Sequence, residues 1–207
     1  MATKLAPARF VRSVLKSFMT ESGLEPRQVA CLALFVPSRS ASNMDPLTQA
    51  LWTTRMSLRL SPSRLPYSLN DLQLRITNAT EGKVDFELDI TKDHTNRLKI
   101  LHGGTIASMV DLGGSLAVAS MGLYATGVST DLNVTYLSGG GKVGEKIQAT
   151  AICDKIGKTL AYTTVTFKNR KGELAARGSH TKFVTHAWGA SPPYTAPEGA
   201  EIADDVD

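Results

Sequence analysis

Three residues at the start of an apolar stretch, His102, Gly103 and Gly104, are followed eight positions after Gly103 by a single carboxylate, Asp111. If the stretch is a helix, its first N–H groups and its dipole favour negative charge, and a glycine there lets a carbonyl approach closely. An ionised carboxylate within an apolar stretch is costly to keep and can take a proton from water. The two positions could therefore stabilise an oxyanion and activate water.

The spacing of Gly103 and Asp111 limits how they can act together. Eight residues of helix span about 12 Å at 1.5 Å each, so both cannot contact one reacting carbonyl within a single subunit. A site that needs both must take Gly103 from one chain and Asp111 from another. We therefore expect dimerisation to be part of the chemistry.

Strand patterns surround this helix, which is predicted over residues 103–121. In the clearest, Val84, Phe86, Leu88 and Ile90 alternate with charged residues, which indicates one buried and one wet face. Short, glycine-rich connections between the later strands predict antiparallel neighbours. The order predicts an α+β fold, an antiparallel sheet wrapped around one long helix. The predicted strands are 72–80, 82–91, 127–138, 144–156, 159–169 and 174–185.

A glycine pair, Gly113 and Gly114, lies in the middle of the predicted helix. Each glycine should cost about 1 kcal/mol relative to alanine. Such a cost is tolerated where another backbone must approach closely, and a strongly curved sheet would supply that reason.

The 207 residues suggest one domain, predicted over 71–186, with extensions. Residues 1–25 are basic and contain an amphipathic helical spacing, which fits a helix packed on the domain or a mitochondrial targeting segment. Residues 26–70, rich in proline and serine, are interpreted as an insertion or linker. Residues 187–207 are predicted to be an acidic, disordered tail.

Composition excludes several functions. The net charge of +4 comes without a basic stripe interleaved with aromatics, so we expect no nucleic acid partner, although an anionic small ligand would fit. The two cysteines have no metal-ligand spacing, and we predict no metal, no cofactor and a reducing location, mitochondrial or cytoplasmic. No stretch is a credible transmembrane helix.

The ordered motifs HTN…LHGGTIASMVD, STDLNVTYLS, GEKIQATA, GKTLAYTTVTF and ARGSHTKFV resemble the hotdog-fold thioesterases, specifically the acyl-CoA thioesterase 13 or PaaI-like branch. The resemblance covers roughly residues 72–185. It implies a hotdog fold, and homodimers with shared active sites joined into one longer sheet, usually associating as homotetramers. The implied reaction is hydrolysis of acyl-CoA to free acid and CoA.

The resemblance also places functional positions at Asn96, Gly103, Asp111 and Ser129, with His102 as the histidine of the HGG motif. Gly103 would supply an oxyanion donor and Asp111 a general base, while short polar side chains could position the water or the thioester. From the residues alone, Asn96 is a turn former, Ser129 a solvated hydroxyl and His102 a packing or hydrogen-bonding histidine.

Binding of CoA requires cations for its phosphates and backbone N–H groups at turns. The resemblance suggests contacts in two turns and on the last strand, whereas lysines at hairpin turns are otherwise simply solvated. The suggested contact residues are Tyr136, Leu137, Ser138, Lys142, Lys155, Ile156, Gly157, Lys158, Thr159, Leu160 and Lys182.

Two other functions share parts of this pattern. A hotdog dehydratase or hydratase pairs a histidine with an acid, but His102 is followed by two glycines and not by the longer Phe-Pro-Gly-type loop of that branch. A non-catalytic acyl-CoA-binding protein would have no need of Asp111. These motifs do not specify the acyl chain.

Overall fold

The computed structural model describes residues 4–21, 74–200 and 202–203. The predicted strands and the long helix are confirmed, with ends that differ by one or two residues, while the predicted insertion over 26–70 lies outside the described residues. In chain order the elements are α1 (Pro7–Glu21), β1 (Leu74–Thr80), β2 (Lys83–Asp89), the short 3-10 helix η3 (Lys92–His94), α4 (Gly103–Ala119), β3 (Val128–Tyr136), β4 (Lys146–Ile156), β5 (Leu160–Lys168) and β6 (Leu174–Phe183).

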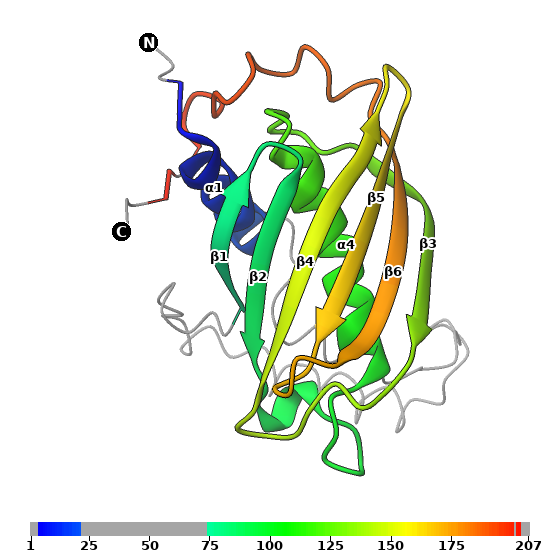
Figure 1. The fold of residues 1–207 in the computed structure, drawn as a ribbon. Helices are drawn as coiled ribbons and strands as arrows, with labels where there is room; N and C mark the ends of the chain where they lie inside the picture. The colour runs from blue at the N-terminus through cyan, green and yellow to red at the C-terminus, as the bar shows by residue number, and fades with distance from the viewer. Residues whose placement is uncertain (1–3, 22–73, 201, 204–207) are drawn as a thin grey trace, which may run out of the picture. The chain divides into compact units, whose positions relative to one another are not determined.

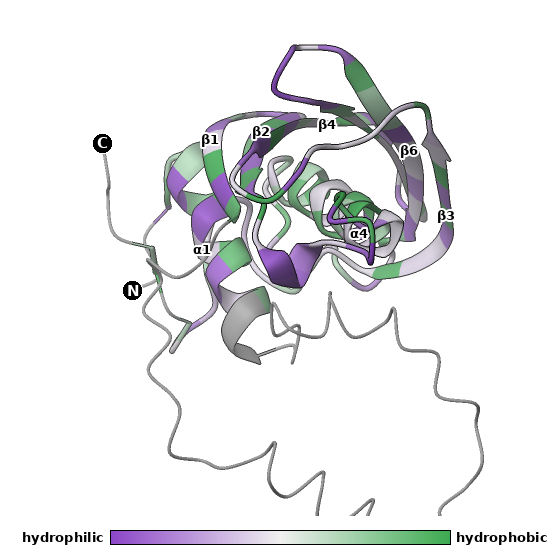
Figure 2. Ribbon diagram, turned by 90° about the horizontal axis from the view of Figure 1, so that it is seen from below, coloured by the Kyte–Doolittle hydropathy of each residue, from purple (hydrophilic) through white to green (hydrophobic). Residues whose placement is uncertain are grey.

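The six strands form one antiparallel sheet in the order β1-β2-β4-β5-β6-β3. The sheet curves around α4, which packs against β2, β3, β4, β5 and β6 (Figure 1 and Figure 2). This arrangement confirms the predicted α+β class and is the hotdog fold. The two edges of the sheet are β1 and β3.

The position of β3 corrects one prediction. A short connection led us to expect β3 beside β4, but β3 pairs with β6, from Val128 opposite Phe183 to Tyr136 opposite Ala176. The connecting residues 137–145 cross the end of the sheet and pack on the approach to α4, where Gly141 O accepts a hydrogen bond from Leu101 N at 2.9 Å. A side chain at Gly140 would come within 2.8 Å of Leu101, so this crossing depends on a glycine.

The glycine pair in α4 makes room for side chains of the sheet, where we had expected backbone. A Cβ at Gly113 would lie 2.8 Å from the Phe86 ring, and a Cβ at Gly114 would lie 2.5 Å from His180 Nδ1. Closely packed interiors have no room for an added methyl group without rearrangement. The glycines therefore let α4 lie close to β2 at Phe86 and close to β6 at His180.

Helix α1 packs on the domain through its apolar face. Phe10, Val11, Val14 and Leu15 are buried, and the Phe10 ring meets Tyr124 edge-on at a centroid distance of 6.1 Å. Burial of this kind is what stabilises a short helix in a protein. The segment is thus a structural helix, and its use in mitochondrial targeting stays a prediction.

The residues after β6 differ from the expected disordered tail. Tyr194 Oη donates to Ser120 O at 2.9 Å, and Leu5 N donates to Tyr194 O at 2.9 Å. The Tyr194 ring also packs edge-on against Phe10. One aromatic residue with several hydrogen bonds therefore fastens the described part of the tail to α1 and to the end of α4.

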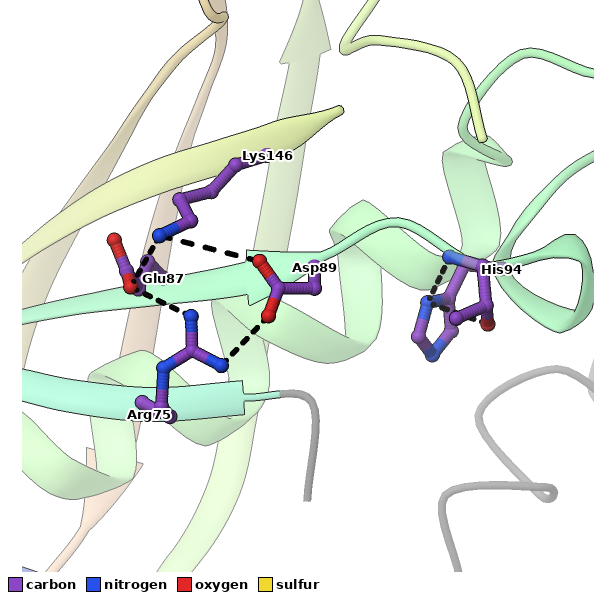
Figure 3. Close-up of polar contacts among 6 residues, drawn as sticks. Arg75, Glu87, Asp89, His94 and Lys146 are labelled. Carbon is purple, nitrogen blue, oxygen red and sulfur yellow. Dashed lines mark hydrogen bonds and ion pairs between the residues drawn. The ribbon is translucent and has the colours of Figure 1, made fainter. Parts of the chain in front are cut away.

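The outer face of the sheet carries ion pairs. Arg75 bonds Asp89 Oδ2 at 2.6 Å and Glu87 Oε1 at 2.8 Å, and Lys146 Nζ lies 2.7 Å from the same Glu87 oxygen (Figure 3). Hydrogen bonds from Arg75 lower the pKa of Asp89. Exposed pairs of this type contribute at most about 1 kcal/mol each, so they serve mainly to keep this face polar.

Candidate active site

The start of α4 presents a free backbone donor. His102 is the N-cap residue, and its Nδ1 accepts a hydrogen bond from Gly104 N at 2.8 Å. The Gly103 N–H is the first of the helix and has no acceptor among the described residues. His102 therefore acts here as a hydrogen-bonding cap, while the N–H of Gly103 remains available for a developing negative charge.

The loop before α4 is organised by Asn96. Its Oδ1 accepts hydrogen bonds from Leu98 N at 2.9 Å and from Ile100 N at 3.3 Å, which is the turn-forming role that the residue type suggests. For the part of the chain described here, no bond to Asn96 Nδ2 is found, so the amide nitrogen can still donate to a ligand.

Buried His94 attaches this loop to the helix. Its Nδ1 accepts from Thr91 N at 3.2 Å (Figure 3), and its carbonyl accepts from His102 N at 2.9 Å. Burial lowers the pKa of His94, so the imidazole is neutral near pH 7. The loop that carries Asn96 is thus joined to the cap that precedes Gly103 by the backbone carbonyl of His94, whose side chain fixes the preceding turn.

A second cluster surrounds Asp111. Ser129 Oγ donates to Asp111 Oδ1 at 3.0 Å, His180 Nε2 lies 3.2 Å from the same oxygen, and Ser129 Oγ and His180 Nε2 are 2.8 Å apart. The Asp111 side chain is 43% exposed, whereas that of His180 is fully buried. The carboxylate is therefore bonded on its protein-facing side and exposed on the other, where it could contact water.

His180 is a neutral donor in this cluster. Burial and the neighbouring Lys182 cation lower its pKa to about 4, and its buried Nδ1 has no partner among the described residues. The tautomer protonated on Nε2 donates to Ser129 Oγ, which in turn donates to Asp111 Oδ1, so we assign the proton to Nε2. Sequence reasoning missed this residue. Its signal was the alternation on the last strand, which puts Gly178, His180 and Lys182 on one face.

Lys182 occupies an interior position and not the surface that nucleotide contact would need. It is 4% exposed and donates to Ser115 Oγ at 2.8 Å, and Ser115 Oγ in turn donates to Asp111 O at 2.9 Å. Burial lowers the pKa of Lys182, while the Asp111 carboxylate raises it. Within one subunit, the predicted CoA contact of Lys182 is therefore replaced by a position behind Asp111.

The predicted site residues, together with His180, fall into two groups along β3. Tyr136 Oη donates to Gly103 O at 2.9 Å, and Lys142 forms an isolated β-bridge with Ile100 in the loop before α4. The Gly103 cluster therefore contains Asn96, Gly103, Tyr136, Leu137, Ser138 and Lys142. The turn 155–160 lies at the same end of the sheet as Ser129, because Phe183 of β6 pairs with Leu160 on one side and with Val128 on the other. The Asp111 cluster therefore contains Asp111, Ser129, His180, Lys182 and the turn 155–160. Ser129 and Tyr136 lie near opposite ends of β3, so one chain does not unite the clusters.

Two further observations concern ligands and membranes. Among residues 4–21, 74–200 and 202–203, no group of three or more His, Cys, Asp or Glu side chains could hold a metal ion. In the same residues, no helix is both long and apolar enough to cross a membrane.

The antiparallel sheet around α4 is a hotdog fold, and comparison with known proteins shows which family it belongs to. The family model of the thioesterase superfamily matches residues 98–176. An esterase-like protein of Schizosaccharomyces pombe is 47% identical over 56% of this chain and 72% of its own length. Acyl-coenzyme A thioesterase 13 of Homo sapiens is 42% identical over 53% of this chain and 79% of its own length.

Solved structures give the same result. The crystal structure of zebrafish thioesterase superfamily member 2 is 35% identical, covers 68% of this chain and 99% of that chain, and superposes with a TM-score of 0.52. The chain belongs to the thioesterase superfamily. It is accordingly a thioester hydrolase.

The depressed pKa of His180 predicts a pH-dependent stability. An unfolded histidine takes up a proton near pH 6.5, but folded His180 does so only near pH 4, so falling pH favours unfolding across this window. The urea midpoint should therefore drop between pH 6.5 and 4, and less steeply in His180→Asn. The exposed His186→Asn variant serves as the control and should follow the wild type. Equal slopes in all three proteins would contradict a neutral, buried His180.

Proposed function

We propose that the protein is an acyl-CoA thioesterase that hydrolyses fatty or aryl acyl-CoA to the free acid and CoA. The observation that carries the proposal is the Ser129–Asp111–His180 cluster, which is open to solvent at Asp111. Asp111 belongs to the same helix as Gly103, whose N–H has no acceptor among the described residues. The human relative named acyl-coenzyme A thioesterase 13 supports CoA as the thiol part of the substrate.

Asp111 and Ser129 would hold the attacking water. As water oxygen bonds the thioester carbon, Asp111 accepts its proton. His180 would support the carboxylate through Ser129, whose Oγ accepts from His180 Nε2 and donates to Asp111 Oδ1. The carbonyl oxygen becomes an oxyanion, which the Gly103 N–H and Asn96 Nδ2 stabilise. The C–S bond then breaks, the acid is released, and the CoA thiolate recovers the proton.

The site would be completed by a second copy of the chain through β3. This edge strand is almost entirely exposed, including the apolar residues Val128 and Leu132. An antiparallel pairing of two β3 strands, centred near Leu132 and Asn133, would bring Ser129 of one chain beside the partner subunit's Tyr136. Asp111 of one chain would then face the partner's Gly103, as the spacing on α4 requires.

The same pairing would gather the CoA contacts. The turn that contains Lys155 and Lys158 lies at the Ser129 end of the sheet, whereas the Tyr136–Lys142 segment lies at the other end. Pairing across β3 would bring the turn of one chain beside the Tyr136–Lys142 segment of the partner, and the two lysines of the turn suit phosphates. Further association into tetramers, and a mitochondrial or cytoplasmic location, stay predictions from the sequence.

Loss of the general base should abolish hydrolysis. Asp111→Asn keeps the size of the side chain but cannot accept the proton, so we expect kcat to fall by about 10²–10⁴. Release of free thiol from medium- and long-chain acyl-CoA measures it, with Asp89→Asn on the outer face as the matched control. An unchanged rate of thiol release in Asp111→Asn would contradict the proposed mechanism. Hydration of enoyl-CoA without thiol release would favour the hydratase alternative.

Mixed dimers should show whether the site is shared. Co-expression of differently tagged Gly103→Val and Asp111→Ala chains gives heterodimers in which one of the two sites keeps both residues. Random pairing would make half of the dimers mixed, so about one quarter of wild-type activity should return. Purification through both tags should raise it to about one half. No rescue in the doubly purified dimer would place both residues of one site in one chain.

Lys182 can be separated from the surface lysines by the choice of substrate. If it acts inside, behind Asp111, Lys182→Met should lower kcat/KM about threefold to tenfold for acyl-CoA and equally for an acyl-N-acetylcysteamine thioester, which has no nucleotide. The control Lys158→Met, in the exposed turn, should affect acyl-CoA alone. A loss confined to acyl-CoA in Lys182→Met would restore the nucleotide contact suggested by the sequence.

A further inference from the structure

Tyr136 makes two contacts with the first peptide groups of α4. Its Oη donates to Gly103 O at 2.9 Å, and a Cβ on Gly103 would come within 3.3 Å of its ring. Burial raises the pKa of Tyr136, so the hydroxyl stays protonated and can only donate to the carbonyl here. Although 52% of the residue is exposed, its hydroxyl therefore makes an intramolecular hydrogen bond.

The start of α4 needs such a restraint. Gly103 and Gly104 have the largest conformational freedom of any residue type, and the first turn of a helix lacks the hydrogen bonds of its interior. The His102 side chain restrains the Gly104 N–H, and Tyr136 restrains the Gly103 carbonyl. The Gly103 carbonyl and the Gly104 N–H belong to the same peptide group, so the two bonds fix this group and, across the Gly103 Cα, restrict the directions open to the Gly103 N–H.

We propose that Tyr136 is a positioning residue for the oxyanion donor of this thioesterase. An N–H donor contributes most when it already points at the future oxyanion, because no reorganisation then accompanies the reaction. The hydroxyl would thus act on kcat through Gly103, which goes beyond the CoA contact suggested by its place in the sequence. The proposal rests on the proposed thioesterase function.

The position of Tyr136 also connects this donor to the edge of the sheet. Tyr136 is the last residue of β3, the edge strand through which we expect the partner to pair. Pairing would fix the end of β3 and with it the hydroxyl that holds Gly103 O. The helix start would therefore become ordered in the same assembly that brings the partner's Asp111 to it.

Removal of the hydroxyl tests the proposal in the full-length protein. Tyr136→Phe keeps the ring that packs on Gly103 but loses the bond, and a hydrogen bond of ordinary strength corresponds to about a threefold to tenfold fall in kcat. KM for acyl-CoA should stay within about twofold. Tyr162→Phe, an exposed tyrosine on the outer face of β5, is the matched control and should keep both constants. A raised KM with unchanged kcat would overturn the positioning role.

A second measurement does not depend on catalysis. With 15N-glycine labelling, the amide signals of Gly103 and Gly104 should be broadened or exchange faster with solvent in Tyr136→Phe than in Tyr162→Phe. Unchanged amides would overturn the proposal even if kcat fell. If the wild-type protein released no thiol from any acyl-CoA but the amides responded, the proposed function would fail while the contact of Tyr136 with the helix start would stand.

Discussion

The fixed rise of one helix is the constraint on which the rest of the site depends. Gly103 and Asp111 both belong to α4, so their separation of about 12 Å cannot be shortened by any movement of loops or side chains. If hydrolysis uses both residues, as we propose, a helix with this separation would supply them to two different reaction centres. Under the proposed mechanism, the need for a second chain thus follows from backbone geometry before any interface is considered.

The strands and the two ends of α4 could be predicted because their patterns are local. Period-two alternation located β2, and the His-Gly-Gly string located the start of the helix. The neighbour of β3 could not be predicted from the length of its connection, because residues 137–145 cross the end of the sheet. His180 was missed for a similar reason: its function depends on which strand lies beside the middle of α4, and that is a tertiary relation.

Asp111 shows how the interior sets the charge at an open site. Two potential cations lie beneath it on β6, but burial acts on them with different outcomes: His180 is neutral and donates one hydrogen bond, while Lys182 keeps its contact with Ser115. A neutral imidazole that donates to Ser129 Oγ supports the carboxylate without forming an ion pair with it. The carboxylate is therefore positioned by Ser129, with the neutral His180 buried behind it.

Strand β3 contacts both clusters of the proposed site. Near one end, Ser129 bonds Asp111, and at the other, Tyr136 bonds Gly103 O. Because β3 is also the exposed edge of the sheet, any partner that pairs with it contacts the strand that bonds Asp111, the proposed base, and Gly103, the proposed oxyanion donor. An edge left open in one chain is a liability that proteins normally cover. Here its covering by a second copy would order the two clusters and complete two identical sites in a single event.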